Sequence, residues 1–267
     1  EMEKNPDYTE EIVLPDIWGE GAIFAFSGIE GETRSATGFV LTFDRKPLDF
    51  LIHTPRRARL VLRLPEPTKV KIATNDVLAV DTPAGPVRVT FSAWHTLVGW
   101  LPEGIKPALE PVDAPDNPEP DPGMLCAVPE GEACLVLLSQ NGRFALAYGA
   151  TPIEARERAA SGLLVNPTSL ISQRLEWVSR IPSLADPDET RFLRKCASVM
   201  KVNTLSPEGT IRQHWSTPDR VPHQHMWLWD SVFHTTGMNW LDPGLSWEFL
   251  QAMLEHARPG GCMPITV

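Results

Sequence analysis

The chain has 267 residues, of which 42% are hydrophobic and 22% are charged, as is typical of a globular protein with one large or two smaller domains. Its formal net charge of −10 argues against nucleic acid or an anionic membrane as a partner, because phosphates are bound by basic surfaces. No apolar run approaches the length that spans a bilayer, and the polar segment 1–6 has no apolar signal region, so we expect a cytoplasmic protein.

The first part of the chain, residues 1–150, has the pattern of many short β-strands. Apolar residues alternate with polar ones in short runs, which are separated by turns rich in Gly, Pro, Asn and Asp. Asn141 and Gly142, between two apolar runs, are the clearest hairpin signal. We therefore predict an antiparallel β-sandwich. The expected strands are residues 22–27, 38–43, 59–64, 70–73, 87–91, 134–139 and 144–148.

One segment of this part, residues 102–123, contains seven prolines and six acidic residues. Such a composition predicts a long solvated loop rather than a strand. The loop is either a wall or lid over a site, or an insertion without a role, and we favour the second interpretation.

The four cysteines have spacings that match no metal site and no redox motif. Cys126 and Cys134 flank an apolar run and could form a disulfide across a hairpin, but we favour buried free thiols. The same interpretation applies to Cys196 and Cys262.

From residue 151 onward the hydrophobic period changes to that of helices. Several apolar-periodic runs follow an Asp, Asn or Thr and a Pro, a pair that is typical of a helix N-terminus. We predict a helical linker over residues 151–182 and further helices over 183–267, one of them from about residue 229 to 239. The fold class is thus α+β with several domains. The expected cap residues are Thr151, Asn166, Asp186 and Asp242.

The stretch 219–234 contains two Trp, three His, one Arg and two Asp, the densest mixture of aromatic and ionisable side chains in the chain. Such a mixture suits a sugar site, since indoles stack on a pyranose while carboxylates, imidazoles and a guanidinium bind its hydroxyls. Asp230 follows Trp229, and a carboxyl that an indole desolvates has a raised pKa, as a general acid requires. Composition leaves a structural interpretation open, in which the Trp residues are core and Asp230 is a helix N-cap.

Other candidate substrate ligands flank Asp230, and each has a structural alternative. Trp227 and Trp229 either stack on the sugar or pack in the core, and we expect one of each. Arg220 either clamps a substrate carboxylate or hydroxyl pair, or forms a salt bridge with Asp219 or Asp230.

Two further candidates are His223 and His225, which lie near His214 in the sequence. A zinc site would need these histidines together with a carboxylate, and the stretch has no helical HExxH-type motif, so we predict no metal. Hydrogen bonds to hydroxyl groups or core packing explain them better. Gly261 is expected to form a backbone turn at the mouth of the site, and no cofactor is expected.

Residues 228–234, Leu-Trp-Asp-Ser-Val-Phe-His, resemble the Leu-Trp-Asp-x-x-Phe-His signature of glycoside hydrolase family 63, in particular its mannosylglycerate-hydrolase-like branch. The runs 219–223 and 259–264 fit the same group, and the resemblance covers residues 205–264. The motif is moderately specific, because related enzymes such as trehalases carry variants of Trp-Asp there. The resemblance implies an N-terminal β-sandwich, a helical linker and an (α/α)6 toroid, of which residues 183–267 would form the first helices.

The resemblance also implies an inverting α-glycosidase that acts on a small α-linked glycoside or oligosaccharide. In such an enzyme a carboxylic acid protonates the leaving oxygen, while a carboxylate activates water on the opposite face. Asp230 matches the general acid. The general base of the family is a later Glu, so a chain or segment not present here would supply it. We interpret Glu248 and Glu255 as surface residues.

Residues 183–267 provide fewer helices than a toroid needs, so we expect a second polypeptide or self-association to cover their apolar faces. The loop 28–33 is a candidate to reach the site from the β-part. Two other functions stay open, namely a glycoside phosphorylase of the same architecture and a non-catalytic carbohydrate-binding subunit. The carboxyl of Asp230 favours catalysis over binding alone.

Overall fold

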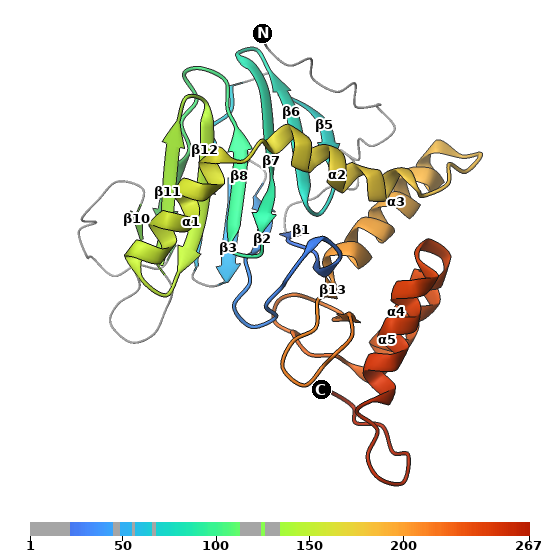
Figure 1. Cartoon of the computed structure of the whole chain (residues 1–267). Helices are drawn as coiled ribbons and strands as arrows, with labels where there is room; N and C mark the ends of the chain where they lie inside the picture. Colours follow the sequence, from blue (N-terminus) through green and yellow to red (C-terminus); the bar gives the residue numbers. More distant parts are fainter. Residues whose placement is uncertain (1–21, 45–48, 55–56, 66–67, 113–123, 126–133) are drawn as a thin grey trace.

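The computed structural model describes residues 22–44, 49–54, 57–65, 68–112, 124–125 and 134–267, which form two large antiparallel sheets followed by five α-helices (Figure 1). The chain therefore has the predicted α+β class. One sheet has five strands in the order β1-β2-β3-β4-β9. These strands are β1 (Ile23–Ala25), β2 (Val40–Asp44), β3 (Asp49–Thr54), β4 (Ala58–Val61) and β9 (Ala108–Pro111).

The other sheet has seven strands in the order β10-β11-β12-β8-β7-β6-β5. The hairpin between β11 and β12 is confirmed, with Gln140 paired to Arg143 and positive φ angles of 51° at Asn141 and 73° at Gly142. The strands are β5 (Lys69–Ala73), β6 (Val77–Thr82), β7 (Gly85–Ala93), β8 (Thr96–Trp100), β10 (Met124–Leu125), β11 (Cys134–Gln140) and β12 (Arg143–Gly149).

The two sheets share one hydrophobic core. Successive residues of a strand point to opposite faces, so in β11 Leu135 and Leu137 lie in this core with Phe24 of the five-stranded sheet. Cys134 and Val136 lie on the other face of β11, in a second apolar cluster. Both faces of the seven-stranded sheet are therefore packed.

Helices α1 (Pro152–Leu164) and α2 (Pro167–Ser179) cover the outer face of the seven-stranded sheet (Figure 1). The approach of α1 is close, because a Cβ added at Gly162 would lie 2.9 Å from the Cβ of Ala145. Thr151 and Asn166 cap the two helices, as predicted, by accepting backbone N–H groups of the first turn.

The C-terminal part contains three helices and a short two-stranded ribbon. Helices α4 and α5 pack against each other, and α4 begins and ends beyond the predicted range 229–239. Asp186 and Asp242 cap α3 and α5, as predicted. The elements are α3 (Pro187–Val202), β13 (Thr204–Leu205), β14 (Trp215–Ser216), α4 (Leu228–Leu241) and α5 (Pro243–Leu254).

Strand β9 corrects the prediction that residues 102–123 form one loop. It pairs with β4, where Leu109 lies opposite Leu60, and both side chains are buried. Pro111 is tolerated because β9 is an edge strand of its sheet and one side needs no N–H donor. Residues 113–123 of the predicted loop lie outside the described residues.

The cysteines also differ from the prediction. Cys134 is disulfide-bonded, so the prediction of a free thiol is wrong for this residue, and Cys126 lies outside the described residues. Cys196 and Cys262 are free thiols, as predicted, but they are exposed rather than buried. Disulfides are rare in the reducing cytosol, so the bond at Cys134 does not favour the predicted cytoplasmic location.

The loop after β1 joins the sheets to the C-terminal part. Ser27 Oγ donates to the carbonyl of Lys201 at 2.5 Å, and the backbone N–H of Thr33 donates to Ser206 Oγ at 2.8 Å. A Cβ added at Gly28 would lie 2.3 Å from the backbone nitrogen of Ser206, so only glycine permits this approach. The loop 28–33 thus lies against the segment between α3 and α4.

A buried cluster of four charges lies at the same junction. The ammonium of Lys201, which is 0% exposed, lies 2.7 Å from Glu30 Oε1 and 2.6 Å from Asp76 Oδ2. Arg174 of α2 pairs with the other oxygen of Glu30, and Thr74 Oγ1 donates to Asp76 Oδ1 at 2.8 Å. Each of the two cations therefore has an anionic partner, which offsets much of the cost of burying them.

We predict that Lys201→Met strongly destabilises the protein. The methionine fills the space of the lysine stem but leaves Glu30 and Asp76 with an unbalanced buried negative charge, which costs about 3–5 kcal/mol. Chemical denaturation of both proteins measures this difference.

The matched control is Glu176→Gln, which removes an exposed i,i+4 pair with Arg180 at 3.6 Å. An exposed pair of this kind contributes about 0–1 kcal/mol. Equal losses of unfolding free energy in the two variants would contradict the proposed contribution of the buried cluster to stability.

Candidate functional site

The motif 228–234 forms the first turns of α4. Trp227 is the N-cap residue and Asp230 is the third residue of the helix, so the interpretation of Asp230 as an N-cap is wrong. An acidic residue in the first turn still interacts favourably with the positive end of the helix dipole. The chain end supports this turn, since the backbone N–H of Leu228 donates to the carbonyl of Ile265 at 2.9 Å.

The carboxylate of Asp230 interacts with the dipole of its own helix but has no individual partner group in the described part of the chain. The residue as a whole is half-buried, but neither carboxylate oxygen is fully enclosed. The carboxylate forms no hydrogen bond or ion pair with the described residues. In contrast, Asp186 and Asp242 cap helices, and Asp76 binds Lys201. A carboxylate without a structural partner remains available to a ligand or to proton transfer.

The two indoles beside Asp230 have different surroundings. Trp229 is 71% exposed and presents an open aromatic surface, so it desolvates its neighbour less than the sequence suggests. Trp227 is half-buried, and its ring meets that of His223 edge to face at a centroid distance of 6.1 Å. Its Nε1 is buried without a hydrogen-bond partner among the described residues. Trp229 is therefore the indole that is placed for stacking.

His234 lies one helical turn after Asp230, and sequence reasoning gave it no role of its own. Its Nδ1 lies 2.9 Å from Ser216 Oγ in β14. Burial lowers the pKa of His234, and the negative charge of Asp230 raises it by less, so the net effect is a lowered pKa. The i,i+4 spacing within the motif was the signal that could have drawn attention to this residue.

Arg220 is enclosed, with 1% of its surface exposed. Its Nη1 donates to the carbonyls of Phe26 at 3.0 Å and Val202 at 2.6 Å, which ties the β-part to the end of α3. Burial lowers the pKa of Arg220 to about 10, an effect that the charge of Glu208 partly opposes. Within the described ranges Arg220 forms no ion pair, so the salt bridge considered with Asp219 or Asp230 is not present there. Its guanidinium stabilises the segment before α4 and lines no open surface.

The other predicted ligands are exposed. His223 Nδ1 lies 3.8 Å from Asp219 Oδ2, and His225 lies on the same surface segment before α4. Gly261 has a φ of 83° and its N–H donates to the carbonyl of Arg258 at 2.9 Å, which confirms the predicted backbone turn. No hydrogen bond or ion pair in the described part of the chain joins these residues to Asp230.

Glu248 is partly exposed, and its carboxylate has partners that the sequence did not suggest. Its Oε2 accepts the backbone N–H of His214 at 3.0 Å and lies 2.6 Å from Nδ1 of the same residue. His214 Nε2 lies 3.2 Å from the carbonyl of Gly28, so this pair links α5 to the loop after β1. Burial raises the pKa of Glu248, but the hydrogen bonds and charge of His214 lower it by more, and the net effect is a lowered pKa. Glu255 is exposed, as predicted.

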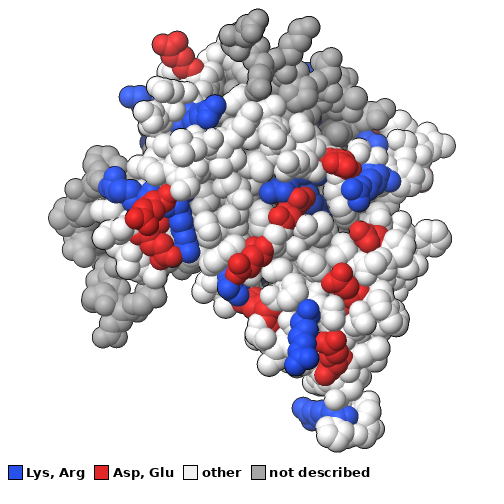
Figure 2. All heavy atoms as spheres, viewed as in Figure 1, with Lys and Arg blue, Asp and Glu red and all other residues white. Residues whose placement is uncertain are grey.

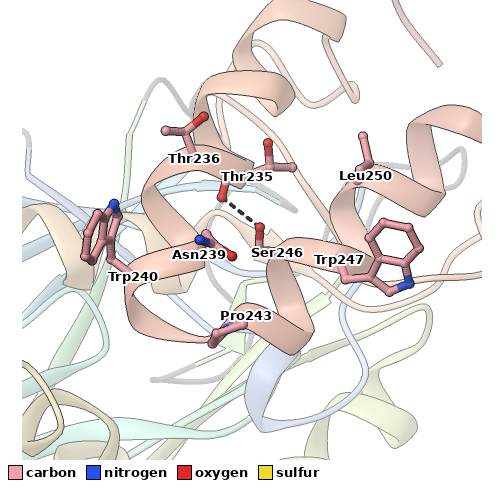
Figure 3. Close-up of a pocket in the computed structure, with 8 residues that line it drawn as sticks. All are labelled: Thr235, Thr236, Asn239, Trp240, Pro243, Ser246, Trp247 and Leu250. Carbon is pink, nitrogen blue, oxygen red and sulfur yellow. Dashed lines mark hydrogen bonds between the residues drawn. The ribbon is translucent and has the colours of Figure 1, made fainter.

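A groove of about 420 Å³ lies between α4 and α5. Figure 3 shows Trp240 and Trp247 on opposite sides of it, with Asn239 and Ser246 between them. Trp240 is 86% exposed. The residues that line the groove are uncharged. They are Thr235, Thr236, Asn239, Trp240, Pro243, Ser246, Trp247 and Leu250.

Helices α3, α4 and α5 expose an unusual number of large apolar side chains. No Lys or Arg occurs between Arg220 and Arg258 in the sequence, and the region of α4 and α5 is largely white in Figure 2. Large exposed apolar patches of this kind mark interaction sites. The side chains are Phe192, Trp229, Val232, Phe233, Trp240, Trp247 and Leu254, and we call this set the apolar face.

The described residues include no group of three or more His, Cys, Asp or Glu that could hold a metal ion. No helix within the same ranges combines the length and apolar character needed to cross a membrane.

Comparison of the sequence with known proteins gives no match, either to a protein-family model or to a curated protein.

We predict that Glu248→Gln destabilises the protein at neutral pH and that this effect disappears in acid. The folded pKa of Glu248 lies below its ordinary value of 4.5, so its contribution to stability is complete above that value and is lost as the pH falls through the folded pKa. Thermal unfolding of both proteins over a pH series measures the difference.

Glu255→Gln is the control, because Glu255 at the C-terminus of α5 is exposed and accepts only a hydrogen bond from Gln213 at 3.2 Å. If the difference in unfolding temperature between wild type and Glu248→Gln stays constant into strong acid, the charge of Glu248 does not stabilise the fold.

Proposed function

We propose that this chain carries the acid half of the active site of an inverting α-glycosidase. Asp230 acts as the general acid and protonates the glycosidic oxygen of a small α-linked glycoside or oligosaccharide. The general base, a Glu in the family 63 enzymes that the motif resembles, comes from a polypeptide or segment outside this chain. No cofactor takes part.

The observation that carries this proposal is the unengaged carboxylate of Asp230 at the start of α4. Within the motif it is the group with acid chemistry, it has no partner in the described part of the chain, and it lies beside the exposed indole of Trp229. A structural aspartate would be expected to hold a cap or a cation, as Asp242 and Asp76 do. A non-catalytic binding subunit has less need of such a group.

The architecture fits the same proposal. The two sheets correspond to the β-sandwich, α1 and α2 to the linker, and α3, α4 and α5 to the first helices of an (α/α)6 toroid. In such an arrangement Trp229 stacks on the sugar, while His223 and His225 offer hydrogen bonds to its hydroxyls. The turn at Gly261 forms part of the mouth of the site.

Asp230→Asn tests the role of the acid. In the native assembly the variant should hydrolyse an α-linked disaccharide about 10²–10⁴-fold more slowly, because the leaving oxygen is no longer protonated. The loss on a 2,4-dinitrophenyl α-glycoside should be much smaller, because that leaving group needs no proton. Steady-state kinetics on both substrates measure the contrast.

Glu255→Gln, which removes an exposed carboxylate at the end of α5, should leave both rates unchanged. Equal losses on the two substrates in Asp230→Asn would contradict the general-acid assignment. If the wild-type protein binds the sugar but does not hydrolyse it, the carbohydrate-binding subunit is favoured. Turnover that requires inorganic phosphate would favour the phosphorylase.

We also propose that a second polypeptide, or self-association, covers the apolar face except for Trp229, which stacks on the sugar. The observation that supports this is the exposure of Phe233 at 75% and Trp240 at 86% on helices without any Lys or Arg. A partner with complementary apolar helices would bury these side chains and bring the general base to the side of the sugar opposite Asp230.

Mass spectrometry tests the partner. The native mass should exceed the 29.6 kDa of the chain, and Trp240→Glu should lower the assembled fraction. Ile153→Glu, which alters an exposed apolar residue of α1, should have no such effect. A wild type that stays at 29.6 kDa under native conditions would refute the partner proposal.

A further inference from the structure

The hydroxyl of Ser216 and Nδ1 of His234 form a hydrogen bond whose direction depends on the tautomer of the imidazole. Ser216 is 2% exposed, so its hydroxyl proton needs a partner within the protein. The Nδ1 of His234 at 2.9 Å is the one acceptor recorded for that hydroxyl in the described part of the chain. We therefore assign Ser216 Oγ as the donor and Nδ1 as the acceptor, which puts the ring proton of a neutral imidazole on Nε2.

The environment keeps this imidazole neutral. Burial lowers the pKa of His234, and Asp230 is the charged group that opposes this effect without reversing it. The hydrogen-bond partner of the ring, Ser216 of β14, is uncharged. Helix α4 packs against α3, α5 and β14, and the pKa shift of His234 has no charged contributor other than Asp230. At neutral pH the Nε2–H group is thus a donor without a positive charge.

This donor has no structural partner. Nε2 of His234 forms no hydrogen bond with the described residues and is not fully enclosed. The same holds for both carboxyl oxygens of Asp230. Residues four apart lie on the same face of a helix, with Cβ atoms about 5–6 Å apart. One sugar ring spans that separation, so the two groups can contact different oxygens of one ligand.

We infer that His234 is a second substrate-contacting residue of this site. Its Nε2–H donates to a hydroxyl oxygen of the sugar, while Asp230 protonates the glycosidic oxygen of the same substrate. Ser216 is a positioning residue that holds the ring in the donor tautomer. This inference rests on the proposed glycosidase function and adds a group that selects a hydroxyl oxygen beside the scissile bond.

The tautomer is measured first, in the full chain and without a substrate. A long-range ¹H–¹⁵N spectrum of the histidine rings at neutral pH should show His234 with its proton on Nε2. Ser216→Ala should weaken that preference, and Asp230→Asn should lower the pKa of His234 further by removing the neighbouring charge. A ring with its proton on Nδ1, or a fully protonated ring at neutral pH, overturns the inference and leaves the role of Asp230 untouched.

The contact with substrate is measured by kinetics in the native assembly. His234→Ala should lower kcat/KM about tenfold on both the disaccharide and the 2,4-dinitrophenyl glycoside, since a hydroxyl contact is needed whatever the leaving group. His234→Gln keeps an N–H donor and should recover much of the loss. His256→Gln, which alters a histidine bonded to Thr210 and to the carbonyl of Ala252, is the control.

The outcomes separate the two proposals. An active wild type with an unchanged kcat/KM in His234→Ala refutes the role of His234 and leaves the glycosidase proposal in place. A wild type that hydrolyses neither glycoside in its native assembly refutes the glycosidase proposal, and the substrate contact of His234 falls with it.

Discussion

The buried ammonium of Lys201 determines how the two parts of the chain meet. Its two anionic partners come from different places, Glu30 from the loop after β1 and Asp76 from the turn between β5 and β6. An unpaired ammonium in this position would be strongly unfavourable, so the end of α3 is stable only where both carboxylates reach it. The candidate site depends on this ion pairing, because the segment that leads into α4 starts at the end of α3 and lies against the loop after β1.

Two further links carry this constraint to α4. Arg220 donates to the carbonyls of Phe26 and Val202, and His214 connects Glu248 of α5 to the carbonyl of Gly28. Each of them joins the loop after β1 to the helical part, and each uses polar groups that would be costly to bury alone. As a result the helix that carries Asp230 is positioned by the β-part as well as by its helical neighbour. The β-part therefore helps to position the candidate site.

Local patterns of the sequence predicted much of the fold, and long-range contacts explain most of what they missed. The alternation in residues 134–148 and the turn at Asn141 and Gly142 depend on nearest neighbours, so the β11–β12 hairpin could be predicted. The caps at Asp186 and Asp242 are equally local. The pairing of Glu248 could not be predicted because its partner lies 34 residues away, and the surroundings of Arg220 involve a carbonyl 194 residues away. The motif located the candidate acid, but it could not show that the carboxylate has no structural partner.

Several charged groups of this chain differ in how they are paired, and the difference bears on the location of the proposed site. Buried or half-buried groups such as Lys201, Asp76 and Glu248 are occupied by partners within the protein. The carboxyl of Asp230 and Nε2 of His234 are only partly buried, are well positioned by helix α4, and yet have no partner in the described part of the chain. The fold gives these two groups no hydrogen-bond partner, and they lie on the helix that carries the exposed indole of Trp229. Under the proposed function a sugar, which has several oxygens and an apolar face, would satisfy both groups at once and cover Trp229.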